Sequence, residues 1–195
     1  MKLIFATNNQ NKVAEIKAAL TNGLEIITLE DANINIDIPE PHNTLEENAR
    51  EKAIVIYNLT NQNCFSEDTG LEVAALNGEP GVRSARYAGD DANNKNNIGL
   101  LLQNMQNAKK RNAQFKTVIS LMLNDLEYQF TGICTGKIIQ EEIGEMGFGY
   151  DAIFVPNGAK KTFAEMMMEE KNKYSHRKKA LAKLIDFLNK YNGKS

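Results

Sequence analysis

A run of amide and hydroxyl side chains near the start of the chain ends on a lysine, and its chemistry suits a phosphate. The run comprises Thr7, Asn8, Asn9, Gln10, Asn11 and Lys12. At a helix start, several backbone N–H groups lack intrahelical partners and can donate to phosphate oxygens, while the Lys12 ammonium adds positive charge. A simple helix cap would use the same residue types, so this alternative stays open.

Carboxylates form the second candidate group. Asp68 follows Glu67 directly, and Glu40 lies in a proline-flanked loop. Mg²⁺ prefers oxygen ligands and typically takes one or two protein carboxylates together with substrate phosphates and water. Because neighbouring strand residues point to opposite faces, Glu67 and Asp68 are not expected to share a role, and Asp68 is the preferred candidate. The alternative is an ordinary surface turn through Thr69 and Gly70.

Two further segments could contact the rest of a nucleotide. In Gly147-Phe148-Gly149-Tyr150-Asp151 the glycines let the backbone approach a ligand, and the two aromatic rings could stack on a base. A tight bend at a strand entry would look the same. Lys171 precedes Ser175-His176-Arg177, which stands at an expected helix start, where the helix dipole is positive. For His176 the alternative is an ordinary surface histidine.

Periodicity predicts the elements that position the first two groups. An apolar run at residues 3–6 indicates a strand, and a helix is expected over residues 12–20. Thr44 and Glu47 have the spacing of a capping box, which predicts a helix from Leu45 to about Asn58. A short strand at 63–67, an acidic turn at 67–70 and a second strand at 71–76 are expected next.

The remaining elements position the other two groups. A third helix that carries Ile98, Leu101, Leu102 and Met105 on one face is expected, and residues 115–123 and 128–139 should form an antiparallel hairpin through Asn124-Asp125. A short strand at 152–155 and a final helix capped by Ser175 complete the pattern. Together these elements predict a mixed α/β fold with one long sheet, in a single domain over residues 1–195.

Composition limits the function classes. Net charge is −2 and there is no long basic stripe, which disfavours a nucleic-acid binder but allows a small anionic ligand. The apolar stretches are too short to cross a bilayer, and the opening residues do not form a signal-peptide core, so a cytoplasmic protein is expected. Cys64 and Cys134 lack metal or redox spacing and are expected to be buried reduced thiols.

Taken together, the motifs resemble the inosine triphosphate pyrophosphatase family over nearly the whole chain. The matching segments are residues 5–12, 47–49, 68–73, 77–81, 84–89, 147–151 and 175–177, in the family's order and spacing. The resemblance implies an elongated mixed sheet flanked by helices, two lobes around a central nucleotide-binding groove, and a homodimer. It also implies Mg²⁺-dependent hydrolysis of ITP, dITP and XTP to the monophosphate and pyrophosphate.

The resemblance also implies roles for matching residues. Residues 7–12 would hold the triphosphate, Glu40 and Asp68 would hold Mg²⁺, and Asp68 would accept the proton. The residues that would contact substrate are Thr69, Phe148, Gly149, Tyr150, Asp151, Lys171, His176 and Arg177. Glu67 stands where the family often has Asp, and its role is left open. Two rival functions remain: a Maf-like pyrophosphatase for modified nucleotides, and a nucleotide sensor without turnover.

Overall fold

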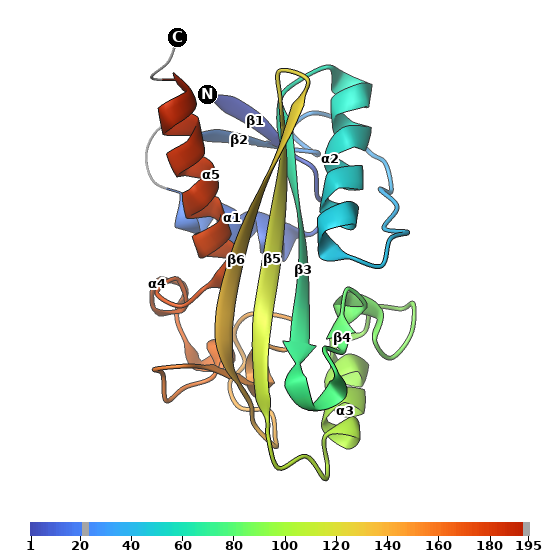
Figure 1. Cartoon of the computed structure of the whole chain (residues 1–195), viewed down its shortest axis with the longest axis vertical. Helices are drawn as coiled ribbons and strands as arrows, with labels where there is room; N and C mark the ends of the chain where they lie inside the picture. The colour runs from blue at the N-terminus through green and yellow to red at the C-terminus, as the bar shows by residue number, and fades with distance from the viewer. Residues whose placement is uncertain (21–23, 193–195) are drawn as a thin grey trace. The chain divides into compact units, whose positions relative to one another are not determined.

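The computed structural model describes residues 1–20 and 24–192 (Figure 1). By its internal contacts, the chain divides into two compact units. The first unit comprises Met1–Asp68, Thr117–Gly132 and Arg177–Ser195, and the second comprises Thr69–Lys116 and Ile133–His176. Within the described residues, seven strands form one sheet. Their order is β2 (Glu25–Thr28), β1 (Lys2–Phe5), β3 (Cys64–Val73), β5 (Asn112–Leu123), β6 (Leu126–Ile138) and β7 (Phe154–Pro156), and β4 (Pro80–Gly81) pairs with β3. The predicted mixed α/β fold with one sheet is confirmed.

The first unit packs helices on both faces of its strands. Strand β1 (Lys2–Phe5) pairs in parallel with β2 (Glu25–Thr28) and with β3 (Cys64–Val73). Leu3 and Phe5 pack against α1 (Gln10–Ala19) and α5 (His176–Asn192), whereas Ile4 packs against α2 (Leu45–Thr60). Since side chains alternate along a strand, α1 and α5 cover one face and α2 covers the other (Figure 1).

Local capping sets the helix boundaries. Helix α1 begins at Gln10, two residues before the predicted start, because the Asn9 side chain accepts from the backbone N–H of Lys12. The predicted cap of α2 is confirmed, since Thr44 Oγ1 accepts from the backbone N–H of Glu47 at 3.2 Å. Helix α5 begins directly after Ser175, as expected. Strand β2 was not predicted.

The acidic turn predicted at residues 67–70 is wrong. Residues 64–73 form one continuous strand, β3, and both Glu67 and Asp68 are buried. Pairing with neighbouring strands therefore overrides the turn preference of Asp, Thr and Gly. Gly70 fits because a Cβ there would lie 2.4 Å from the carbonyl oxygen of Gly81 on β4 (Pro80–Gly81).

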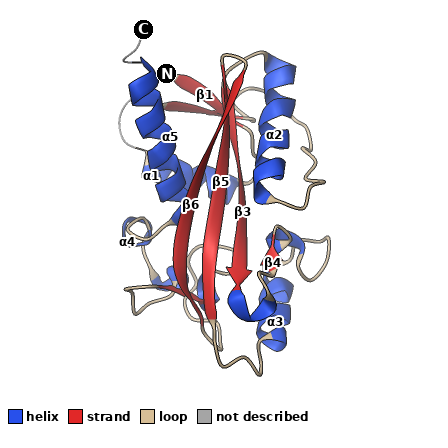
Figure 2. Cartoon of the chain, in the orientation of Figure 1, coloured by secondary structure: helices blue, strands red, loops and turns tan. Residues whose placement is uncertain are grey.

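The predicted hairpin is confirmed and is longer than expected. It consists of β5 (Asn112–Leu123) and β6 (Leu126–Ile138), drawn as two long strands in Figure 2. Asn124 and Asp125 have φ values of 49° and 67°, which is the left-handed backbone that a two-residue hairpin turn requires.

The second unit has a core of its own. Helix α3 (Asn94–Asn104) packs Ile98 and Leu101 against Phe115 and Phe154. The short strand expected at 152–155 is β7 (Phe154–Pro156), which pairs antiparallel with β6. The other elements are four 3₁₀ turns, η1 (Ala74–Leu76), η2 (Ser84–Arg86), η3 (Asp151–Ile153) and η4 (Phe163–Glu165), and the short helix α4 (Met168–Lys171).

One smaller expectation is confirmed. Cys64 and Cys134 are both buried thiols. Among the described residues, no helix has the length and apolar character needed to span a membrane.

Candidate active site

The turn at residues 7–12 joins β1 to α1, and the side-chain amides of Asn8 and Asn9 form hydrogen bonds with the backbone. Thr7 Oγ1 accepts from the backbone N–H of Asn9, and Asn9 Oδ1 accepts from that of Lys12, both at 3.2 Å. Asn8 Nδ2 donates to the carbonyl oxygen of Ile36 at 2.9 Å. Gln10 and Asn11 are exposed. The turn is thus a capped helix start, and Asn8 ties it to the segment that leads to Glu40.

Glu40 and Asp68 converge on one ammonium group. Lys52 Nζ from α2 contacts Glu40 Oε1 and lies 3.2 Å from Asp68 Oδ1. The side chains of Lys52 and Asp68 are buried, whereas that of Glu40 is 26% exposed. The structure therefore brings together the two predicted metal ligands, with a lysine that the sequence analysis did not select.

Burial and charge oppose each other in this cluster. Burial raises the pKa of Asp68, and the ammonium groups of Lys52 and Lys12 lower it only in part, so the net shift is upward. For Lys52 the balance has the other sign. Burial lowers its pKa, but the carboxylates of Asp68 and Glu40 outweigh burial and raise it overall. Lys52 therefore stays charged between the two carboxylates.

Glu67 points to the opposite face of β3 and lies between two cations. Its Oε1 is 3.3 Å from Lys12 Nζ on α1, and its Oε2 accepts from Arg177 Nε on α5 at 2.8 Å. A second nitrogen of Arg177 contacts Glu15 on α1. The expectation that Glu67 and Asp68 have separate roles agrees with this placement, because each carboxylate meets cations from different helices.

The charges in this buried network support one another. Burial raises the pKa of Glu67, but Arg177 and then Lys12 lower it further, to about 2. Burial likewise lowers the pKa of Arg177, and the carboxylates of Glu67 and Glu15 raise it overall. Both groups therefore remain ionised although they are almost fully buried.

In the second unit, Asp151 and Lys171 form a buried ion pair. Lys171 Nζ lies 2.5 Å from Asp151 Oδ2, which also accepts from the backbone N–H of Phe148 at 2.9 Å. The same ammonium lies over the Phe148 ring, 5.5 Å from its centroid. These predicted substrate residues are thus neighbours, and Phe148 remains half-buried.

The glycines of this segment have different reasons to be glycine. Gly147 has φ of 79°, and a Cβ there would lie 2.1 Å from Asp151 Oδ2. Gly149 has φ of 60°, and a Cβ there would meet no atom within 4 Å. Gly147 is therefore required by contact as well as by backbone conformation, whereas Gly149 is required by conformation alone.

Tyr150 and His176 belong to the core of the second unit. The Tyr150 hydroxyl donates to the carbonyl oxygen of Ser84 at 2.9 Å, and burial raises its pKa. The His176 ring stacks on Phe115 with centroids 4.7 Å apart, so it is not a surface histidine. Thr69 follows Asp68 on β3 and is half-buried. Of the two aromatics expected to stack on a base, Tyr150 is buried and Phe148 is partly accessible.

Sequence reasoning missed Lys52 and Glu15. Lys52 lies on the buried face of α2 with Ala49, Ala53 and Ile56, so a charged residue at an apolar helical position was the available signal. Glu15 shows the same pattern beside Ile16 on α1. Neither pattern indicates which residue the charged side chain contacts, because the contacting residues are remote in sequence.

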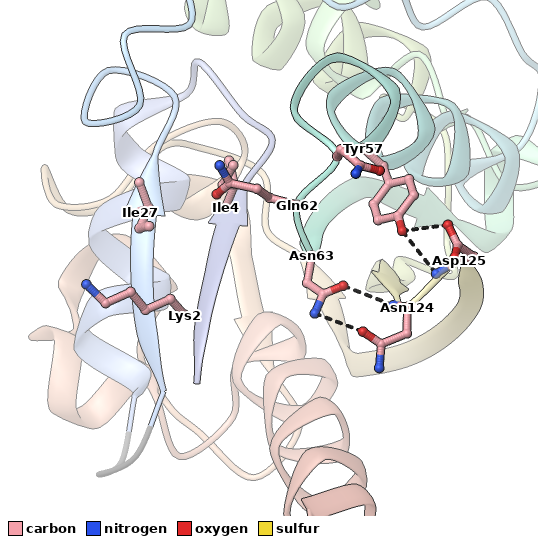
Figure 3. Close-up of a pocket in the computed structure, with 9 residues that line it drawn as sticks. Lys2, Ile4, Ile27, Tyr57, Gln62, Asn63, Asn124 and Asp125 are labelled. Atoms are coloured by element: carbon pink, nitrogen blue, oxygen red, sulfur yellow. Dashed lines mark hydrogen bonds between the residues drawn. The ribbon is translucent and has the colours of Figure 1, made fainter.

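A separate pocket of about 520 Å³ in the first unit is shown in Figure 3. Its lining consists of Lys2, Ile4, Ile27, Tyr57, Asn61, Gln62, Asn63, Asn124 and Asp125, none of which is a candidate residue. Asn63 and Tyr57 point toward the β5–β6 turn, where Tyr57 donates to Asp125 at 2.7 Å. In the parts of the chain that the structure describes, no cluster of three or more His, Cys, Asp or Glu side chains could hold a metal ion.

Comparison with known proteins assigns the chain to a family. The family model described as "Ham1 family" matches residues 3–187. The dITP/XTP pyrophosphatase of Flavobacterium johnsoniae is 52% identical over 188 residues, which covers 96% of this chain and 98% of that protein. The dITP/XTP pyrophosphatase of Christiangramia forsetii is 50% identical over 190 residues, covering 97% of this chain and 100% of that protein.

A solved structure agrees with these matches. The Ham1 protein of Staphylococcus aureus has a TM-score of 0.88 and 38% sequence identity, covering 98% of this chain and 100% of that chain. The residues that carried the resemblance in sequence therefore belong to a match that spans nearly the whole chain in both sequence and structure. This chain is a member of the Ham1 family.

Proposed function

We propose that this protein is a nucleoside triphosphate pyrophosphohydrolase that cleaves deaminated purine nucleotides, dITP, ITP and XTP, to the monophosphate and pyrophosphate. Membership of the Ham1 family supports the proposal, as do relatives named dITP/XTP pyrophosphatase that are 52% and 50% identical over nearly their full length. The observation that carries it is the buried cluster of Asp68, Glu40 and Lys52, together with Lys12 at the start of α1.

The carboxylates in this cluster fit a divalent cation, which we propose to be Mg²⁺. Glu40 and Asp68 would hold it, since both are hard oxygen donors and both already contact a single cationic atom, Lys52 Nζ. When bound, the ion would neutralise charge on the triphosphate oxygens and favour ionisation of a bound water.

The chain's own residues supply the other requirements of the reaction. Lys12 and the backbone N–H groups at the start of α1 hold the phosphate tail, because a helix start and an ammonium both attract anions. Asp68 orients the water that attacks the α-phosphorus and accepts its proton.

The other predicted substrate residues are proposed to contact the nucleoside. Phe148 provides a half-buried ring for stacking, and Lys171 is held beside it by Asp151. Selecting hypoxanthine or xanthine over adenine needs a donor aimed at the 6-oxo group, because adenine would leave that donor unpaired at a cost of about 1–3 kcal/mol. His176 and Arg177 are the proposed donors, and Thr69, Gly149 and Tyr150 complete the proposed contacts.

We further propose that residues 1–195 act as one domain, that the enzyme is a homodimer, and that it acts in the cytoplasm without nucleic acid. These points rest on the family resemblance and on the small net charge of −2.

Pyrophosphate release tests the proposed function directly. Purified protein is incubated with ITP, XTP, dITP, ATP, GTP and dTTP in the presence of Mg²⁺, and release is measured for each. We expect rapid release from ITP, dITP and XTP, slow release from ATP and GTP, and loss of activity in Asp68→Asn and with excess chelator. Asp90→Asn, which changes an exposed carboxylate, serves as the control.

The same assay separates the rival functions. A preference for dTTP would favour a Maf-like enzyme, and no release from any nucleotide would favour a sensor. Retention of full activity by Asp68→Asn would remove Asp68 from the reaction. Glu40→Gln should raise the Mg²⁺ concentration that gives half-maximal activity, whereas Asp37→Asn, an exposed neighbour on the same segment, should not.

A further inference from the structure

We propose that Glu67 is a positioning residue that holds Lys12 and Arg177 in fixed places by giving one carboxylate oxygen to each. This inference rests on the proposed function, which assigns Lys12 to the phosphate tail and Arg177 to substrate contact. It adds a role for Glu67, which would touch neither the substrate nor the metal.

The proposal rests on the fact that the two carboxylate oxygens of Glu67 contact different cations. Oε1 of Glu67 lies 3.3 Å from Lys12 Nζ, and Oε2 accepts a hydrogen bond from Arg177 Nε at 2.8 Å. Lys12 belongs to the first turn of α1 and Arg177 to the first turn of α5, on the same face of β3. One side chain on a central strand therefore sets the place of two cations that are far apart in sequence.

Burial makes these contacts strong determinants of position. The Glu67 side chain is 0% exposed, that of Arg177 is 2% exposed and that of Lys12 is 14% exposed. Solvent screening is weak at such sites, and a charged group that loses its partner there is strongly disfavoured. Lys12 and Arg177 are therefore expected to remain in contact with the Glu67 carboxylate.

Glu15 completes the charge balance. It contacts Arg177, so two carboxylates face two cations in this network. Buried ion pairs are weak sources of net stability, because apolar residues of similar volume often stabilise a fold equally well. A network in which three buried charges, those of Glu67, Arg177 and Glu15, join the mostly buried Lys12 is thus better explained by the need to place Lys12 and Arg177 than by stability alone.

Asp68, the next residue on β3, belongs to a separate ion pair. Asp68 points to the other face of the strand and contacts Lys52, so changing Glu67 leaves that ion pair in place. A loss of function in a Glu67 variant would therefore act through Arg177 and through Lys12, whose charge also acts on Asp68.

The test compares Glu67→Gln, which removes the charge, with Glu67→Asp, which keeps it on a shorter side chain. Glu25→Gln is the control, because Glu25 is 60% exposed and forms only a surface ion pair with Lys2. Four quantities are measured for each folded variant: kcat and KM for pyrophosphate release from dITP, the affinity for inorganic triphosphate by calorimetry, and the solvent exchange rate of the Arg177 Nε–H by NMR.

For Glu67→Gln we expect KM to rise at least 10-fold with a smaller change in kcat, triphosphate affinity to fall at least 5-fold, and Arg177 Nε–H exchange to accelerate. For Glu67→Asp we expect the same changes at about 2- to 5-fold, a partial rescue by the retained charge. Wild-type KM and wild-type Arg177 exchange in Glu67→Gln would overturn the proposal. If Glu67→Gln does not fold, Glu67→Asp provides the test. Wild-type KM and wild-type Arg177 Nε–H exchange in Glu67→Asp would then overturn the proposal.

Failure of the proposed function would look different. If the wild-type protein releases no pyrophosphate from dITP, the proposed function falls, while triphosphate affinity and Arg177 exchange still test the role of Glu67. If the wild-type protein is active and both variants behave as Glu25→Gln does, the role of Glu67 falls and the proposed function stands.

Discussion

The Lys52 ammonium lies 3.2 Å from Asp68 Oδ1 and also contacts Glu40, so one buried cation forms ion pairs with both candidate metal ligands. Lys52 belongs to α2 and Asp68 to β3, 16 residues apart. This contact makes the spacing of the two carboxylates depend on how α2 packs on the strand. It also identifies Lys52 as the residue whose loss should disturb the cluster most.

Replacing Lys52 by methionine should lower both activity and stability. Without its charge, the buried Asp68 carboxylate loses its nearest cation, and breaking such a pair costs about 3–5 kcal/mol. We expect kcat for dITP to fall by roughly 100-fold or more, with a lower thermal midpoint. Lys52→Arg keeps the charge and should retain part of the activity and part of the stability. Arg50→Met, on the exposed face of α2, is the control and should change neither kcat nor the thermal midpoint. Equal kcat in Lys52→Met and wild type would exclude a role for this cation.

Replacing Asn8 by alanine should weaken metal dependence rather than abolish turnover. The Asn8 side chain donates to the carbonyl oxygen of Ile36, on the segment that leads to Glu40. Loss of one such hydrogen bond costs about 0.5–1.5 kcal/mol, so the Mg²⁺ concentration for half-maximal activity should rise by roughly 2- to 10-fold. Asn35→Ala, at an exposed position of the same segment, is the control. A change in nucleotide KM alone would instead indicate direct phosphate contact by Asn8.

Alanine at Gly147 should impair substrate binding more than alanine at Gly149. Both positions have positive φ and pay a conformational cost of about 1–2 kcal/mol. Only the new Cβ at Gly147 collides with Asp151 Oδ2, the atom that holds Lys171. We expect KM for dITP to rise at least 5-fold more in Gly147→Ala than in Gly149→Ala. Similar KM values in the two variants would argue against a role for the Asp151–Lys171 pair.

The Cys64 thiol should resist modification in the native protein. Burial raises its pKa from 9.0 to about 12, which lowers the thiolate fraction at neutral pH by roughly 1000-fold. Because the native state favours the neutral thiol, this contribution to stability is complete below pH 9 and is lost as pH rises from 9 toward 12. An aromatic disulfide reagent at pH 8 should label a Cys134→Ser variant only after denaturation. Rapid labelling of the native variant would show that Cys64 is accessible.

Local features were predictable where neighbouring residues alone decide the structure. The hairpin turn at Asn124-Asp125 and the cap of α2 at Thr44 were both found from sequence, because a left-handed turn and an N-cap depend on residues only a few positions apart. The segments with candidate chemistry were also recognised, since their residue types are unusual in combination and their order matches a known family.

Partners remote in sequence were decided by the tertiary structure. The Asp68-Thr69-Gly70 sequence favours a turn, yet it continues a strand because the sheet supplies hydrogen bonds that a local preference cannot offset. Glu15 meets Arg177 only when α1 and α5 pack on one face of β3, and Lys52 meets Asp68 only when α2 packs on the other. The sequence alone determined which side chains carry charge. Packing determined which charges are buried together, because burial and distance set their energies and neither is a property of neighbouring residues.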